Sequence, residues 1–92
     1  MKEHTINLIE IATIAMEGMR KEKEYIDGVK QGLEFMRDIK VYYGTYLDCI
    51  LYVNQKLTIA SLNAIDNNAY IGMIALYSAM IDVLAFLARK EK

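Results

Sequence analysis

The 92-residue sequence has no proline, no tryptophan, a single cysteine and a single histidine. One cysteine cannot form a disulfide within its own chain, so a disulfide framework is excluded. The lone His4 has no second histidine or cysteine at metal-ligand spacing, so no zinc motif is present. Because proline is absent and only five residues are glycine, few residues interrupt helices. These absences favour long helices that pack without covalent or metal support.

The sequence also lacks an excess of charge of either sign. Eleven Lys and Arg oppose 12 Asp and Glu, for a net charge of −1, which argues against a nucleic acid as a bulk electrostatic partner. Disorder is unexpected because 54% of the residues are hydrophobic. The length allows one compact domain, residues 1–92.

The charges are unevenly distributed along the chain. Residues 20–40 contain 11 of the 23 charged side chains with alternating sign, which is typical of a solvated helix face. Residues 41–88 contain only four: Asp48, Lys56, Asp66 and Asp82. So much apolar helix surface exceeds what one small chain can cover, and a contiguous apolar patch marks a partner. We therefore expect a homo-oligomer.

The pattern predicts an all-α fold, a small antiparallel bundle of three to four helices that is completed by oligomerisation. Helices are expected at about 5–24, 26–43, 46–65 and 69–90. The clearest amphipathic stripe lies in 26–43 with a spacing of three or four residues. It consists of Ile26, Val29, Leu33, Met36 and Tyr43 and is interrupted only by Lys40, which follows Ile39. The link 20–25 has no strong cap, so the alternative is that the first two helices form one continuous rod.

Two helix breaks can be assigned from local residue chemistry. Gly44 suits the left-handed position after a helix, and Thr45 with Asp48 forms a capping box for the next helix. The run Asp66-Asn67-Asn68 is the second expected break, because Asn tolerates turns and Asp or Asn caps helices.

The last helix is apolar on every side. Residues 69–88 carry one charge, Asp82, over a length that can span a bilayer, although an Asp at the bilayer centre costs up to about 3 kcal/mol. We favour burial against a second copy of the chain over a membrane. Asp82 either faces water or forms a buried pair that fixes the interface. The expected interface residues are Met73, Ile74, Tyr77, Met80, Ile81, Asp82 and Leu84.

Tyrosines cluster around Gly44, close to two cations. Aromatic rings with cations can stack a nucleobase and hold a phosphate, and the same tyrosines also serve as ordinary packing or interface residues. The candidate ligand-binding residues are Tyr42, Tyr43, Tyr46, Lys40 and Arg37. The ligand would be a small anionic molecule, such as a nucleotide, held between subunits.

Catalytic chemistry has no sequence support. Cys49 has no neighbouring base on its helix and is expected to be a buried core thiol, and no phosphate loop or catalytic triad motif is present. We therefore expect a protein that is not an enzyme, with no catalytic residue, metal or cofactor. The N-terminal segment lacks the features of a signal peptide, and a lone cysteine suits a reducing cytoplasm.

The expected function is that of a non-enzymatic helical interaction protein, an inhibitor or adaptor of the kind encoded by phages and mobile elements. It would act as a homo-oligomer through its apolar helix faces. Two alternatives stay open: an oligomer that sequesters a small anionic molecule, and a small membrane protein anchored by 69–88.

Overall fold

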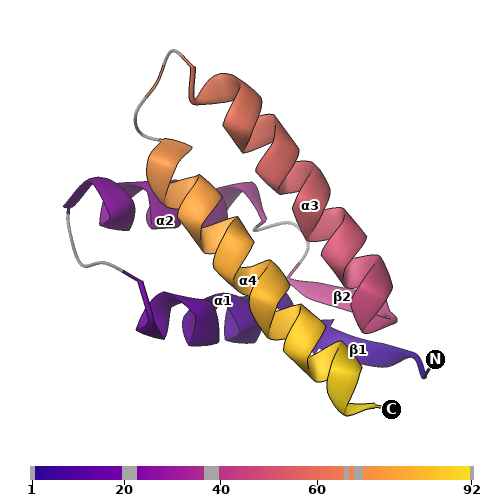
Figure 1. The fold of residues 1–92 in the computed structure, drawn as a ribbon. Coiled ribbons are helices and arrows are strands. Elements are labelled where there is room, and N and C mark those ends of the chain that lie inside the picture. Colours follow the sequence, from indigo (N-terminus) through magenta and orange to yellow (C-terminus); the bar gives the residue numbers. More distant parts are fainter. Residues whose placement is uncertain (1, 20–22, 37–39, 66, 68–69, 92) are drawn as a thin grey trace.

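The computed structural model describes residues 2–19, 23–36, 40–65, 67 and 70–91. Within these residues the chain forms four helices and a small two-stranded sheet (Figure 1). Their order is β1 (His4–Asn7), α1 (Leu8–Glu17), α2 (Lys23–Phe35), β2 (Val41–Gly44), α3 (Tyr46–Asn63) and α4 (Tyr70–Lys90). The predicted small, mainly helical fold is confirmed, and the sheet is an addition to it.

The sheet corrects the predicted ends of the first two helices. β1 and β2 pair antiparallel, with Ile6 opposite Tyr42 and Thr5 opposite Tyr43, so segments assigned to helices are strands. Val, Tyr, Thr and Ile are favoured in strands, and the two segments find each other only after the helices between them fold back. Gly44 ends β2 with a φ of 158°, so its predicted place after a helix is also wrong.

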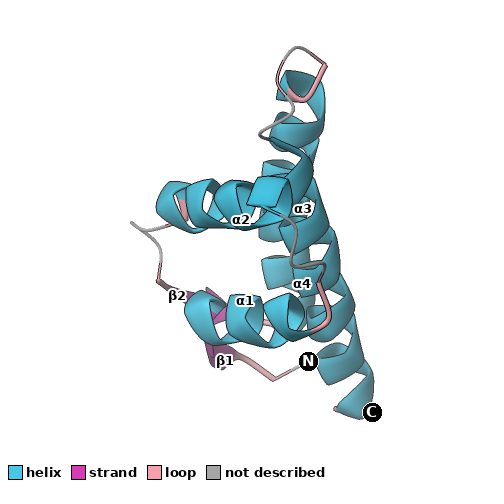
Figure 2. Ribbon diagram, turned by 90° about the vertical axis from the view of Figure 1, so that its left-hand side faces the viewer, coloured by secondary structure: helices cyan, strands magenta, loops and turns pink. Residues whose placement is uncertain are grey.

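The chain turns sharply between α1 and α2. The side chain of Asn7 caps α1 by accepting hydrogen bonds from the amides of Ile9 (2.9 Å) and Glu10 (3.2 Å). The helix ends at Glu17, and residues 20–22 lie outside the described part. Figure 2 shows α1 and α2 as two separate helices, one above the other. The alternative of one continuous rod is therefore wrong.

A helix begins after each of the two predicted breaks. Thr45 caps α3, since its hydroxyl accepts a hydrogen bond from the amide of Asp48 at 3.1 Å. A break also separates the end of α3 at Asn63 from the start of α4 at Tyr70. Asp66 and Asn68, expected to form it, lie outside the described residues.

Helix α4 is the centre of the core, because α1, α2 and α3 all pack against it (Figures 1 and 2). Its Leu76, Met80 and Leu84 are fully buried. Gly32 of α2 permits a close approach, since a Cβ there would lie 3.1 Å from Leu76 Cδ2. The Tyr77 hydroxyl donates a hydrogen bond to the Gly32 carbonyl at 3.2 Å, which would otherwise be an unpaired carbonyl of the last turn of α2.

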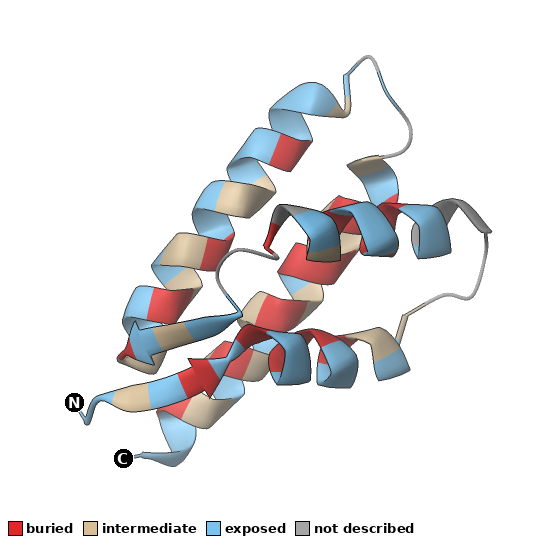
Figure 3. Cartoon of the chain, turned by 180° about the vertical axis from the view of Figure 1, so that it is seen from behind, coloured by how far each residue is buried: buried red, intermediate tan, exposed pale blue. Residues whose placement is uncertain are grey.

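The charged segment lies mainly on the surface, as its sequence indicates. Asp27, Lys30 and Glu34 are exposed on α2, whereas Val29 and Met36 are buried. Figure 3 shows buried and exposed residues on α1, α2 and α3 as well. Val29 and Leu33 of the predicted stripe thus place α2 on the core, whereas Ile26 near its start is 40% exposed.

Candidate interaction surface

The expected ligand-binding tyrosines do not converge on one site. Side chains alternate along a strand, and accordingly Tyr42 is half-buried whereas Tyr43 is 74% exposed on the other face of the sheet. The Tyr42 ring lies against Tyr52 of α3, with ring centroids 5.9 Å apart. Lys40 is exposed, and its carbonyl accepts a hydrogen bond from the Leu8 amide at 2.9 Å.

Of the other two members of that set, the structure describes only Tyr46. The Tyr46 ring stacks on His4 of β1, with centroids 4.4 Å apart, and His4 also hydrogen-bonds Glu91 at the other end of the chain. Arg37 lies outside the described residues. Tyr42 and Tyr46 thus contact different partners, Tyr52 of α3 and His4 of β1, and connect the sheet to α3.

Cys49 is the expected core thiol. Its side chain is fully buried, and burial raises the pKa of the thiol to about 11. Burial and then the charge on Tyr52 raise the pKa of Tyr77 to about 12. A thiol needs a lowered pKa to act as a nucleophile near neutral pH, so the environment of Cys49 favours packing over reactivity.

Four of the expected interface residues on α4 belong to the core of a single chain. Met73, Tyr77, Met80 and Leu84 are at most 1% exposed, since the chain's own helices cover them. Ile74 and Ile81 are half-buried, and Asp82 is exposed. The main apolar stripe of α4 is thus already covered in the absence of a second copy.

Helix α4 is also the candidate for a membrane span. It is long and apolar enough to cross a bilayer by length and composition, and 39% of its most apolar window is buried inside the folded chain. A core helix passes the same test, because central helices of small domains are apolar on most sides.

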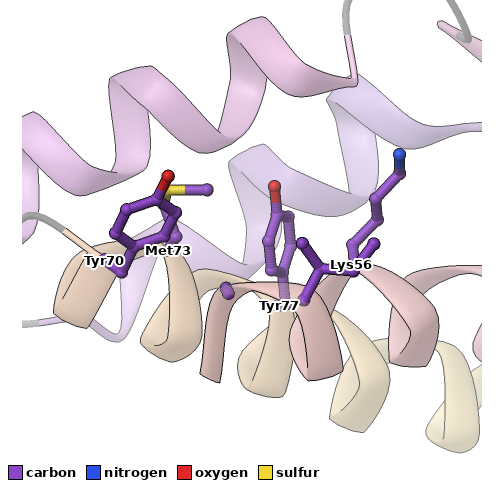
Figure 4. A pocket seen from close by; sticks show the side chains of 6 residues that line it. Lys56, Tyr70, Met73 and Tyr77 are labelled. Atoms are coloured by element: carbon purple, nitrogen blue, oxygen red, sulfur yellow. The ribbon is translucent and has the colours of Figure 1, made fainter. Parts of the chain in front are cut away.

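An open apolar cleft lies between α3 and α4, near the ends that the 64–69 connection joins. Its volume is about 240 Å³, and Figure 4 shows Lys56, Tyr70, Met73 and Tyr77 around it. The Lys56 ammonium also lies 5.5 Å from the centre of the Tyr52 ring. Pockets for drug-sized ligands usually measure about 300–1,000 Å³ and enclose their ligand, so this cleft is small for such a role.

An uncovered apolar surface lies on the outer side of α3, and we call it the α3 face. Helix α3 lies at the edge of the molecule and packs on α4 along one side only (Figures 1 and 3). Successive members of the face are three or four residues apart, so they share one side of the helix. The α3 face consists of Leu47, Leu51, Asn54, Thr58, Leu62 and, in the turn after the helix, Ile65.

The α3 face is both exposed and uncharged. Leu51, Leu62 and Ile65 are 63%, 67% and 79% exposed. Single exposed leucines are common, whereas apolar residues grouped on one helix side mark a binding surface. On the α3 face they form one pair at each end, with Asn54 and Thr58 between the pairs. The two charged residues of α3, Asp48 and Lys56, lie off this row. The spacing of the leucines indicates the α3 face from sequence alone. The predicted interface lies instead on α4, because α4 is the more apolar helix.

No family model matches the sequence, and no curated protein and no solved structure matches it either.

Proposed function

We propose that the protein is a non-enzymatic interaction protein, an adaptor or inhibitor, that binds its partner through the α3 face. The observation that carries the proposal is the row of exposed leucines on a helix side without charge. Leaving this surface in water is unfavourable by roughly 25 cal/mol per Å² of apolar area. A second helical surface is the natural partner, because ridges of side chains on one helix fit grooves on another.

One further observation agrees with a binding role. Cys49 is buried with a raised pKa, so the single thiol of the chain packs in the core. The tyrosines expected to hold an anion are divided between two faces of the sheet. A ligand-sequestering role consequently has less structural support than a docking role.

The membrane alternative would require a different use of α4. Tyr77, Leu76 and Met80 would have to face lipid, whereas in the folded chain they hold α2 and α3 in place. The core would have to come apart to release α4. This cost favours the docking proposal over a membrane anchor.

Site-specific photocross-linking tests the proposed function. A photoreactive phenylalanine derivative at Leu51 or Leu62, in cells that produce the protein, is expected to form a covalent adduct with a protein. Ile14 on α1 is the matched control, since it is an apolar side chain that is 51% exposed outside the α3 face. We expect no comparable adduct from position 14.

The adducts distinguish the alternatives. A protein adduct from the α3 face, whether with a second copy or with another protein, supports the proposal. Adducts from position 14 alone, or no adduct at either position, would refute binding through the α3 face. Retention of the chain in membranes after alkaline extraction would favour the anchored alternative instead.

A further inference from the structure

The α3 face has nearly the same pattern in both chain directions. From either end it presents two large apolar residues, then a polar residue at the centre. Leu47 and Ile65 lie equally far from residue 56, as do Asn54 and Thr58, and Leu51 and Leu62 differ by one position. A surface of this kind can pair with itself when the second copy runs in the opposite direction, as a twofold axis requires.

We infer that the partner of the α3 face is the same face of a second copy, packed antiparallel about a twofold axis near residue 56. This inference rests on the proposed function and specifies its partner. In the dimer Leu47 packs against the partner's Ile65, and Leu51 against the partner's Leu62. Asn54 lies beside the partner's Thr58.

Charge and dipole favour the antiparallel direction over the parallel one. Parallel helices would align their macrodipoles and bring both exposed Asp48 carboxylates to the same end of the dimer. In the antiparallel arrangement each N-terminal end lies beside a C-terminal end that has no charged residue between Leu57 and Ile65. The antiparallel pairing therefore avoids repulsion between like charges.

The two central polar residues can pair with each other. Thr58 Oγ1 donates to the Asn54 carbonyl of its own helix at 3.0 Å, so its lone pairs remain able to accept a hydrogen bond from the partner's Asn54 amide. A polar pair within an apolar seam fixes register, since any shift leaves its groups unpaired. The centre of the α3 face thus specifies the alignment of the two helices.

The size of the α3 face is suited to a dimer in exchange with monomer. The 18 residues of α3 extend about 27 Å, at 1.5 Å per residue. Two such faces would together bury on the order of 1,000 Å², the lower end of the range for specific interfaces. Exchange between copies is therefore expected to be rapid enough for mixing experiments.

Disulfide trapping of mixed variants tests both the interface and its direction. Asn54→Cys and Thr58→Cys chains are prepared separately, then mixed and oxidised, and dimers are identified by intact mass under non-reducing conditions. The mixture is expected to form a covalent dimer containing one copy of each variant, whereas each variant alone does not, because residue 54 faces residue 58 and not itself. Native Cys49 does not interfere, since it is fully buried.

Two controls make the result specific. Asn54→Cys mixed with Ile65→Cys should not cross-link, because these positions are about 10 Å out of register along the helix. Leu51→Glu should weaken dimerisation about 100-fold in sedimentation equilibrium, since the change occurs twice per dimer, while the folded structure is retained at this exposed position. Ile14→Glu adds the same charge at an exposed apolar site and should leave dimerisation unchanged.

The other outcomes overturn the inference in different ways. Cross-linking of Asn54→Cys with itself would establish a parallel dimer and refute the antiparallel one. A dimer that survives Leu51→Glu would place the interface elsewhere. A chain that stays monomeric at high concentration would refute self-association, and the proposed function would then still stand if photocross-linking from the α3 face captures another protein.

Discussion

At the scale of single residues, the ionisable groups of the core are held in their neutral forms. Cys49 and Tyr77 are both buried and have raised pKa values of about 11 and about 12. Burial disfavours the charged form of each group, because the interior cannot solvate it as water does. Burial also raises the pKa of Tyr42 and of Tyr52. The whole tyrosine–cysteine cluster therefore resists deprotonation while the chain is folded.

The first prediction concerns alkaline pH. Below about pH 9 the Cys49 thiol is protonated in both the folded and the unfolded chain. Between about pH 9 and pH 11 the unfolded chain loses this proton while the folded chain keeps it, so the free energy of unfolding should fall as the pH rises. Tyr77 extends the fall to about pH 12. Urea unfolding at a series of pH values measures the effect.

Cys49→Ala provides the control for this pH dependence. The variant lacks the thiol, so the stability difference between wild type and variant should shrink as the pH rises from 9 to 11. A difference that stays constant over this range would show that Cys49 titrates alike in both states, against the prediction.

At the scale of elements, side-chain caps decide where two of the helices begin. Asn7 ends β1 and caps α1 with its side-chain oxygen, and Thr45 follows β2 and caps α3. Asn7 is the last residue of its strand and Thr45 directly follows its strand, so each cap stands where the chain passes from strand to helix. The Thr45 cap was predictable from local sequence. Asn7 with Glu10 three residues later is also a capping pattern, but it lies inside the predicted helix 5–24.

The second prediction is that Thr45→Ala lowers the free energy of unfolding by about 1 kcal/mol, because the Asp48 amide loses its acceptor. Thermal or urea unfolding measures the change. Thr13→Ala is the matched control: the Thr13 hydroxyl bonds the Ile9 carbonyl at 2.8 Å within α1, where alanine is the better helix former. Equal losses in the two variants would argue against the assigned cap.

At the scale of the whole molecule, one chain builds its own core around α4 and leaves α3 uncovered on its outer side. Leu76 is fully buried at the contact with α2, whereas Leu62 is 67% exposed on α3. The same residue type therefore serves folding at one position and, in the function that we propose, association at the other. The two functions can be separated by mutation, because the two leucines lie on different helices.

The third prediction uses this pair of leucines. At concentrations low enough for the chain to be monomeric, Leu76→Ala should lower the free energy of unfolding by about 2–5 kcal/mol, as a buried leucine does when a cavity replaces it. Leu62→Ala should change it by less than about 0.5 kcal/mol. Unfolding followed by circular dichroism measures both. A large loss from Leu62→Ala in the monomer would mean that the α3 face belongs to the core.

Composition and periodicity determined the helical fold of this protein and several of its helix boundaries. Helix formation depends on residues within a few positions of one another. Local chemistry therefore predicted the stripe of α2, the cap at Thr45 and the break before α4, and the absence of proline favoured helices throughout. The burial of Cys49 was likewise expected, because no base neighbours it on its helix. These features needed no knowledge of which helix packs on which.

Only the tertiary structure decided which apolar surfaces are covered. The strands β1 and β2 lie more than 30 residues apart in the chain, so their pairing depends on a long-range contact that no local pattern encodes. For the same reason Met73 and Leu84 on α4 became core, while Leu51 and Leu62 on the less apolar α3 stayed exposed. The sequence alone determined how much apolar helix surface the chain has, and the packing of α1, α2 and α3 on α4 decided that the α3 face is left exposed.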